Sequence, residues 1–196
     1  MQANVHKDMI RVMIDTTPPK PLAENRMNII LIGMPGSGKS TVGVQLAKTL
    51  GLDFIDTDIM IQTQEGRQLQ DIQDNDGHVA LRAIEEHVIL GLDTQGALIS
   101  TGGSAIYSDT AMQHLTSLGI IVFLEVSVDE LEKRINGQGP RGIACSEGQT
   151  FFDIYTERTP LYRRYADITY NNETTINITD LVDLIQAQND GSTKRV

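Results

Sequence analysis

The stretch MNIILIGMPGSGKSTVGVQLAKTL, residues 27–50, decides the fold of this chain. An apolar run at 28–33 leads into a glycine-rich loop, and the loop leads into a segment with Val42, Leu46 and Leu50 at helical spacing. The loop matches the pattern G-x-x-x-x-G-K-[ST] from Gly33 to Ser40. Strand, glycine loop and helix in this order predict a site that holds the phosphates of a nucleotide.

Further short apolar runs alternate with longer amphipathic segments along the rest of the chain. This alternation predicts an α/β fold, a five-stranded parallel sheet with helices on both faces. The expected strands are 28–33, 52–56, 97–101, 119–126 and 166–170. The expected helices are 39–50, 57–64, 78–93, 108–118, 128–135, 150–165 and 179–188.

The chain divides into one domain with a tail at each end. Residues 1–26 end in a proline-rich stretch, TTPPKPLAENR, and are expected to form a tail or linker. Residues 27–190 are expected to form the domain, and 191–196 a C-terminal tail. A chain of 196 residues with 40% hydrophobic content is long enough for one sizeable core.

Composition and charge restrict the partners and the compartment. The formal net charge of −10 argues against a nucleic-acid partner, which needs clustered Lys and Arg. With a single cysteine, Cys145, no disulfide framework can form, which indicates a reducing compartment. No apolar run is long enough to span a bilayer, and residues 1–20 lack the apolar core of a secretory signal, so we expect a cytoplasmic protein without a membrane partner.

The residue types of the glycine loop explain how it would bind phosphate. Glycines let backbone N–H groups approach phosphate oxygens, Lys39 reaches the outer phosphates, and the Ser40 hydroxyl can ligate Mg²⁺. The nucleotide-binding residues expected from this loop are Gly33, Pro35, Gly36, Ser37, Gly38, Lys39, Ser40 and Thr41.

The nucleotide could act as a switch, a fuel or a phosphoryl donor. A switch GTPase would carry an NKxD motif, which this chain lacks, and the DNDG at 74–77 is a weak signal by itself. Glu125 closes the strand 119–126 where a motor ATPase would have an acidic residue, but we interpret it as a strand-end residue.

Asp56 and Asp58 close the second strand, at the edge where open α/β sheets bind ligands. Asp56 could hold Mg²⁺ or could cap the following helix, and the pair alone does not decide between these roles. Asp58 could accept a proton or a hydrogen bond from a substrate hydroxyl.

Further polar residues suggest an acceptor site. Arg82 and Glu85 are three apart on one helical face, so the carboxylate could orient the guanidinium. Gly102 and Gly103 follow a strand directly, where bare backbone can approach a ligand. Arg158 precedes Pro160, and Arg163 and Arg164 are interpreted as surface charges. A glycine-rich stretch at about 136–149, beside Arg134 and containing Arg141, has the composition of a mobile lid.

Together these motifs resemble the shikimate kinases, small P-loop enzymes of the nucleoside-monophosphate-kinase-like fold. The resemblance spans Met27 to about residue 190 and rests on GMPGSGKST, DTD, LRAIEE, TGGS, the lid arginine and ERTPLYRRYAD. It implies an enzyme that phosphorylates the 3-hydroxyl of shikimate with ATP and Mg²⁺. Two arginines with planar forks suit a small carboxylate substrate.

The resemblance also implies residue roles. Lys39 and Ser40 would hold the ATP phosphates with Mg²⁺, Asp56 would support the metal, and Asp58 would be the base. Arg82 and Arg158, with backbone contact from Gly102 and Gly103, would grip the substrate carboxylate. Arg141 would close onto the transferred phosphate, and Arg134 would lie against adenine.

Three positions depart from the family pattern, and all lie near the acceptor or the lid. Ser104 stands where a third glycine is usual, Leu81 where an aromatic is common, and RGIA at 141–144 where RPLL is usual. A paralogous kinase for another small hydroxy or amino acid, such as homoserine or gluconate, therefore stays open. A nucleotide-binding regulatory module without transfer activity is the other alternative. A monomer is plausible for a kinase of this size.

Overall fold

The computed structural model describes residues 27–136, 148–174 and 176–191. Its sheet has five strands in the order β2-β3-β1-β4-β5, and every neighbouring pair is parallel. The predicted five-stranded parallel sheet is therefore confirmed. The strands are β1 (Asn28–Ile32), β2 (Asp53–Asp56), β3 (Ala97–Ser100), β4 (Gly119–Glu125) and β5 (Ile168–Asn171).

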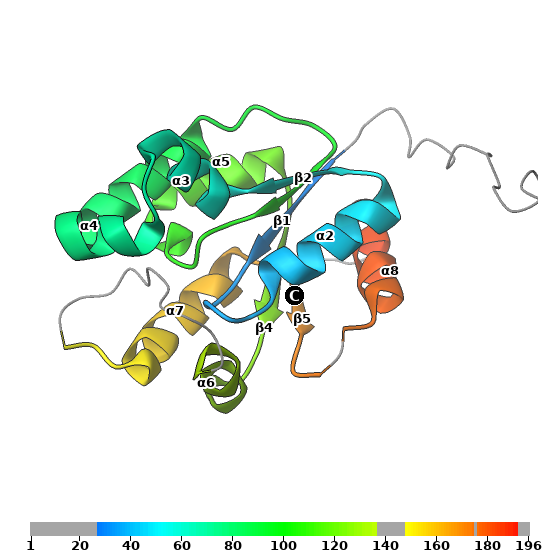
Figure 1. Cartoon of the computed structure of the whole chain (residues 1–196). Helices are drawn as coiled ribbons and strands as arrows, with labels where there is room; N and C mark the ends of the chain where they lie inside the picture. Colours follow the sequence, from blue (N-terminus) through cyan, green and yellow to red (C-terminus); the bar gives the residue numbers. More distant parts are fainter. Residues whose placement is uncertain (1–26, 137–147, 175, 192–196) are drawn as a thin grey trace, which may run out of the picture.

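Helices cover both faces of this sheet (Figure 1). Side chains alternate along central β1, so Ile29 and Leu31 pack on one face, whereas Ile30 and Ile32 pack on the other. Because both faces of the sheet are buried, the sequence of β1 is a nearly continuous run of apolar residues. The first face is covered by α2 (Lys39–Leu50) and α8 (Ile178–Asn189). The second is covered by α4 (Leu69–Leu90), α5 (Asp109–Leu118), α6 (Val128–Asn136) and α7 (Phe151–Tyr165).

Most predicted helices agree with the structure to within about a residue at each end, but the prediction of 78–93 missed the first segment of its helix and ended three residues too late. Helix α4 begins at Leu69 and ends at Leu90, with a kink at Gly77, where φ is 82° and ψ is 171°. Its first segment packs through buried Ile72 beside Ile61 of α3 (Thr57–Glu65). This apolar contact stabilises a helix that the local Asp, Asn and Gly residues disfavour.

The carboxyl ends of the parallel strands bring the candidate site together. The glycine loop follows β1, Asp56 ends β2, and Gly102 and Gly103 follow β3. A short 3-10 helix, η1 (Ala105–Tyr107), comes next and was not predicted. In open parallel sheets this edge is where ligands bind.

Asn28 forms hydrogen bonds to three segments at the opposite edge of the sheet, where the amino ends of the strands lie. Its amide donates to the Thr94 carbonyl at 2.7 Å and to the Leu118 carbonyl at 3.1 Å, and its Oδ1 accepts from the Ala97 N–H at 2.9 Å. The side chain is 1% exposed. All three bonds therefore form away from bulk water, at the edge remote from the glycine loop.

Some predictions concern residues outside the described ranges. They include the tail at 1–26, most of the expected lid together with Arg141, and most of the C-terminal tail. Among the helices that the structure describes, none is both long and apolar enough to cross a membrane.

Candidate active site

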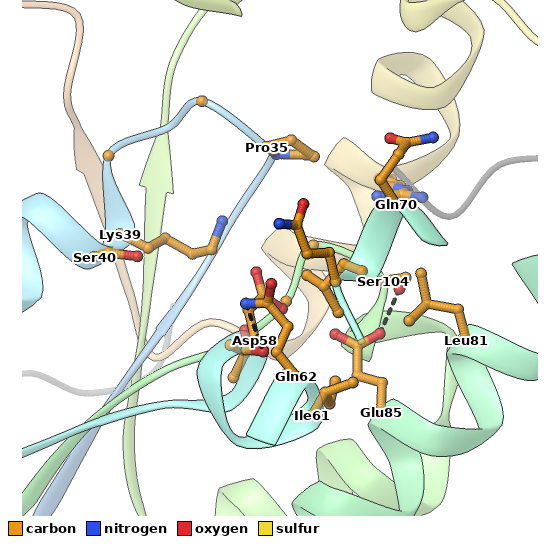
Figure 2. A pocket seen from close by; sticks show the side chains of 18 of the residues that line it. Pro35, Lys39, Ser40, Asp58, Ile61, Gln62, Gln70, Leu81, Glu85 and Ser104 are labelled. Atoms are coloured by element: carbon orange, nitrogen blue, oxygen red, sulfur yellow. Dashed lines mark hydrogen bonds between the residues drawn. The ribbon is translucent and has the colours of Figure 1, made fainter. Parts of the chain in front are cut away.

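A cleft of about 350 Å³ opens at the carboxyl edge of the sheet. This volume suits a small-molecule ligand. Figure 2 shows Lys39 extending from α2 into the side of the cleft opposite Glu85, with Asp58 between them. The lining residues are Pro35, Gly36, Gly38, Lys39, Ser40, Thr41, Asp58, Ile61, Gln62, Gln68, Leu69, Gln70, Leu81, Glu85, Thr101, Gly102, Gly103, Ser104 and Arg158.

The glycine loop forms one end of the cleft. Gly36 and Gly38 have φ values of 81° and 92°, which residues with a side chain rarely adopt. Lys39 Nζ donates to the carbonyls of Gly33, at 2.9 Å, and of Met34, at 3.0 Å. Burial lowers the pKa of Lys39 to about 8, against the opposing effect of Asp58, Asp56 and Glu85. An incoming phosphate would favour the charged form of this amine.

Asp56 caps a helix, one of the two roles that its position allowed, and also contacts Ser40. Its Oδ1 accepts from the backbone N–H groups of Asp58, at 3.0 Å, and Ile59, at 3.4 Å, so it caps α3. Its Oδ2 accepts from the Ser40 hydroxyl at 2.7 Å. The cap therefore fixes a carboxylate against the hydroxyl that was expected to bind metal.

The Ser40 and Asp56 oxygens fit Mg²⁺, a hard cation that prefers oxygen ligands. Within the described ranges, no group of three or more His, Cys, Asp or Glu residues could hold a metal ion.

Asp58, Gly102 and Glu85 meet in the middle of the cleft. A Cβ atom on Gly102 would lie 2.8 Å from Asp58 Oδ1 and would overlap Glu85 Oε1. Only a glycine therefore allows both carboxylates to approach this loop.

Glu85 is 3% exposed, and its Oε2 accepts from the hydroxyl of Ser104, a contact that the sequence did not predict. Its Oε1 is buried and has no hydrogen-bond partner in the structure. Burial raises the pKa of Glu85 to about 7, and the Ser104 hydroxyl opposes the shift. Ser104, one of the departures from the family pattern, thus stabilises the ionised form of a buried carboxyl.

The two arginines that were expected to bind the carboxylate both lie close to the ring of one tyrosine, Tyr107. Arg158 is 1% exposed and lines the cleft, with its Nη1 beside Gly103. Arg82 does not line the cleft, and its guanidinium carbon lies 3.8 Å from the centre of the Tyr107 ring. Tyr107 had no role in the sequence analysis, because a single aromatic in a short loop carries no pattern.

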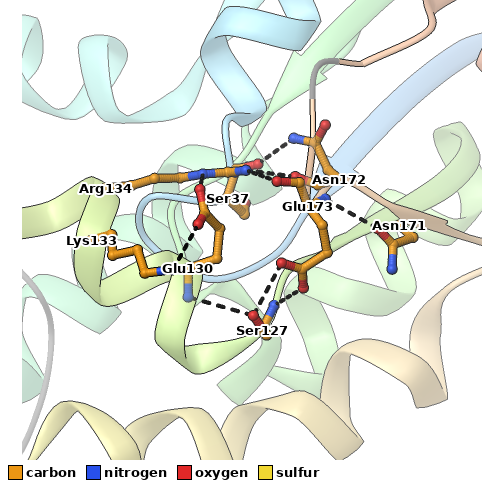
Figure 3. A network of polar contacts seen from close by, with 8 residues as sticks. All are labelled: Ser37, Ser127, Glu130, Lys133, Arg134, Asn171, Asn172 and Glu173. Carbon is orange, nitrogen blue, oxygen red and sulfur yellow. Dashed lines mark hydrogen bonds and ion pairs between the residues drawn. The ribbon is translucent and has the colours of Figure 1, made fainter.

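Arg134 lies apart from the cleft, in a polar network shown in Figure 3. It donates to Glu130 Oε1 at 3.0 Å and to the carbonyls of Asn172, at 2.8 Å, and Glu173, at 3.0 Å. The Asn172 amide donates to the Ser37 carbonyl at 2.8 Å. Arg134 is thereby connected to the outer side of the glycine loop.

The structure brings together most of the predicted site. Lys39, Asp58, Gly102, Gly103 and Arg158 share the cleft. Ser37 is fully buried beneath the loop, and Gly33 is not a lining residue. The sequence analysis missed three lining glutamines, Gln62, Gln68 and Gln70. Gln68 and Gln70 lie at the start of α4, which was not predicted to be helical. A correct prediction of where α4 begins would have placed both side chains near the site.

A family model described as shikimate kinase matches residues 35–188. This chain belongs to the shikimate kinase family. A shikimate kinase of Haemophilus influenzae is 37% identical over 175 residues, covering 86% of this chain and 97% of that protein. A shikimate kinase of Actinobacillus pleuropneumoniae is 38% identical over 155 residues, covering 78% and 89%.

Solved structures agree with the sequence relatives. The shikimate kinase of Acinetobacter baumannii in complex with shikimate has a TM-score of 0.71 and 31% identity, covering 86% of this chain and 96% of that one. The enzyme of Aquifex aeolicus has a TM-score of 0.68 and 29% identity, covering 85% and 98%. The predicted P-loop kinase fold is therefore confirmed.

Proposed function

We propose that this protein transfers the γ-phosphoryl group of ATP to the 3-hydroxyl of shikimate, forming shikimate 3-phosphate and ADP. Family membership supports the reaction, as does the relative that was solved in complex with shikimate. The observation that carries the proposal is one cleft lined by Lys39, Asp58 and the buried Arg158. These residues suit a phosphate, a hydroxyl and a carboxylate respectively.

At the donor end, the loop residues bind ATP. Lys39 neutralises charge on the outer phosphates, and backbone N–H groups of the loop and α2 contact phosphate oxygens. Ser40 and Asp56 would hold Mg²⁺, which would supply positive charge to offset the charge of the phosphates. We assign Arg134 to the adenine and Arg141, which lies outside the described residues, to the transferred phosphate.

At the acceptor end, Asp58 binds the reacting hydroxyl and removes its proton. The hydroxyl oxygen forms a bond to the γ-phosphorus, and the bond from that phosphorus to the bridging oxygen of ADP breaks. Arg158 binds the carboxylate from the lining of the cleft, and Arg82 assists from beside Tyr107, outside that lining. Gly102 and Gly103 let the backbone approach the substrate ring. Holding the substrate at both ends restricts it to one orientation, which favours in-line attack.

The remaining proposals concern the compartment, the partners and the oligomeric state of the protein. We propose a cytoplasmic enzyme that acts as a monomer and binds neither nucleic acid nor membrane. The net charge of −10 supports the absence of a nucleic-acid partner.

A coupled assay of ADP release tests the proposed function. Mg-ATP is supplied with shikimate, quinate, gluconate or homoserine, and ADP release without acceptor gives the background. Shikimate should give the highest kcat/KM by a wide margin. A rate with shikimate no higher than the background, together with turnover of another acid, would reject the proposal in favour of a paralogous kinase. Background release with every acceptor would favour a module without transfer activity.

A further inference from the structure

Tyr107 contacts both arginines that the proposed function assigns to the substrate carboxylate. The guanidinium carbons of Arg82 and Arg158 lie 3.8 Å and 5.2 Å from the centre of its ring. Arg158 Nε also donates to the Tyr107 hydroxyl at 3.2 Å. One side chain therefore contacts both cationic groups, through its π face and through its oxygen.

This arrangement addresses a physical difficulty of the site. Two guanidinium groups that lie close to the same ring repel each other. The π face of an aromatic ring attracts a cation, and a phenol oxygen accepts a hydrogen bond from one. Tyr107 thus offsets part of the repulsion between the two arginines.

The contacts also decide which part of Arg158 faces the cleft. A guanidinium is a rigid planar fork, so fixing Nε fixes the direction of the other nitrogens. With Nε directed at Tyr107, Nη1 lies beside Gly103, a lining residue. Tyr107 therefore orients the edge of Arg158 that meets the ligand.

Tyr107 is itself held firmly by its element. Helix η1 packs against both α4, which carries Arg82, and α7, which carries Arg158. The Tyr107 N–H donates to the Ser104 carbonyl at 3.0 Å, and neighbouring Ala105 and Ile106 are buried. Burial raises the pKa of the Tyr107 phenol, as does the nearby Glu157 carboxylate, so the hydroxyl stays protonated at neutral pH.

We propose that Tyr107 is the positioning residue for carboxylate recognition, holding Arg82 by its ring and Arg158 by its hydroxyl. The inference rests on the proposed function for the identity of the acid. The role proposed for Tyr107 differs from a general structural role because it affects only the binding of the charged end of the substrate. Tyr107 should therefore determine how strongly the site prefers an acid over the matching neutral compound.

The test compares shikimate with its methyl ester, which keeps the ring and hydroxyls and lacks the charge. Binding is measured by calorimetry without nucleotide, and kcat and KM are measured with Mg-ATP. Tyr107→Phe removes the hydroxyl and keeps the ring, whereas Tyr107→Leu removes both. Tyr165→Phe is the matched control, because this tyrosine ends α7 at the other edge of the sheet and its hydroxyl bonds to Asp109.

Wild type should bind the acid much more tightly than the ester. Tyr107→Phe should reduce that preference about tenfold, the scale of a hydrogen bond to a charged group. Tyr107→Leu should reduce it about fiftyfold, because the cation–π contact is lost as well. The KM for ATP should change less than about twofold, and Tyr165→Phe should behave as wild type.

The outcomes separate this inference from the proposed function. Variants that weaken acid and ester equally, or leave the preference unchanged, would overturn the role of Tyr107 even if wild type phosphorylates shikimate. If the preference for the acid depended on Tyr107 but wild type did not phosphorylate shikimate, the inference would be supported and the proposed function rejected. A wild type that binds neither compound would overturn both.

Discussion

Asp58 lies where the donor and acceptor ends of the cleft meet, beside Gly102 and across from Lys39. The proposed reaction needs a group at this point that accepts a proton from the attacking hydroxyl. A carboxylate can do so, whereas an amide of nearly the same shape cannot. Replacing Asp58 therefore separates the chemical step from nucleotide binding.

Asp58→Asn should lower kcat by about 10²- to 10⁴-fold, the usual contribution of a general base, and change the Kd for ATP only slightly. Steady-state kinetics and calorimetry give the two numbers. Asp53→Asn is the matched control, because it alters an exposed aspartate at the other end of β2. If Asp58→Asn kept wild-type turnover, Asp58 would not be the base.

Glu85 gives a prediction about pH and stability. Because burial raises its pKa from 4.5 to about 7, the folded protein binds this proton more tightly than the unfolded chain does. Stability from this group is full below about pH 4.5 and is lost as the pH rises through about 7. Glu85→Gln cannot ionise and removes this dependence.

Between pH 5.5 and pH 8, the free energy of unfolding of wild type should fall, relative to Glu85→Gln, by on the order of 2 kcal/mol. Urea denaturation of both proteins at both pH values measures the difference. Exposed Glu132 provides the control, since Glu132→Gln should follow wild type. Parallel pH profiles for wild type and Glu85→Gln would show that the buried carboxyl does not titrate in this range.

Single residues differ in how far the sequence could predict them. Lys39 and Ser40 sit in a contiguous motif whose chemistry is local, so their place was predictable. The Ser104–Glu85 bond and the Tyr107 contacts join residues far apart in the chain, and they depend on how η1 packs on α4 and α7. No periodicity encodes such contacts.

At the scale of elements, the segment after β5 supports the glycine loop. Asn172 is 5% exposed, and its amide donates to the Ser37 carbonyl, while its own carbonyl accepts from Arg134 of α6. The connection joins β5, α6 and the loop before α2 (Figure 3). The loop geometry that binds phosphate thus depends partly on a distant part of the chain.

Asn172→Ala should raise the KM for ATP about five- to tenfold, because losing a buried hydrogen bond costs about 1–1.5 kcal/mol and loosens the phosphate loop. The KM for shikimate should stay within about twofold. Asn171→Ala removes only an exposed bond from the Glu173 N–H and keeps the contact between Asn172 and Ser37, so it should resemble wild type. Equal changes in both KM values would argue against a selective effect on the loop.

The elements also show where local pattern fails. Helix α2 was predicted with its exact bounds, because a glycine loop before it and Gly51 after it mark both ends. The segment 69–76 was missed because its Asp and Asn residues, followed by Gly77, are typical of a turn, whereas tertiary burial of Ile72 favours a helix. Because this segment was not predicted as a helix, Gln68 and Gln70 were not recognised as lining residues, so the error affected the predicted site as well as the predicted fold.

At the scale of the whole molecule, the two edges of the sheet have different roles. The site occupies the carboxyl edge, and Asn28 joins β1, β3 and the start of β4 at the other. Asn28→Ala should lower the free energy of unfolding by about 2–4 kcal/mol, because buried backbone groups lose their partners. Thermal and urea unfolding measure this loss.

Below its lowered melting temperature, Asn28→Ala should keep wild-type KM values for ATP and shikimate. The exposed Asn189→Ala serves as a control that should change neither stability nor activity. If the variant changed either KM strongly at a temperature where it is fully folded, the two edges of the sheet would be coupled, contrary to this account.

The central claim is that the cleft directs one phosphoryl group to one hydroxyl of a small acid. The most direct measurement is NMR of the product, with ³¹P and ¹H spectra recorded after wild type has consumed limiting Mg-ATP in the presence of shikimate. The account predicts one phosphomonoester, at the 3-hydroxyl, equal in amount to the ADP formed. ADP with inorganic phosphate and no ester, or an ester at another hydroxyl, would contradict it.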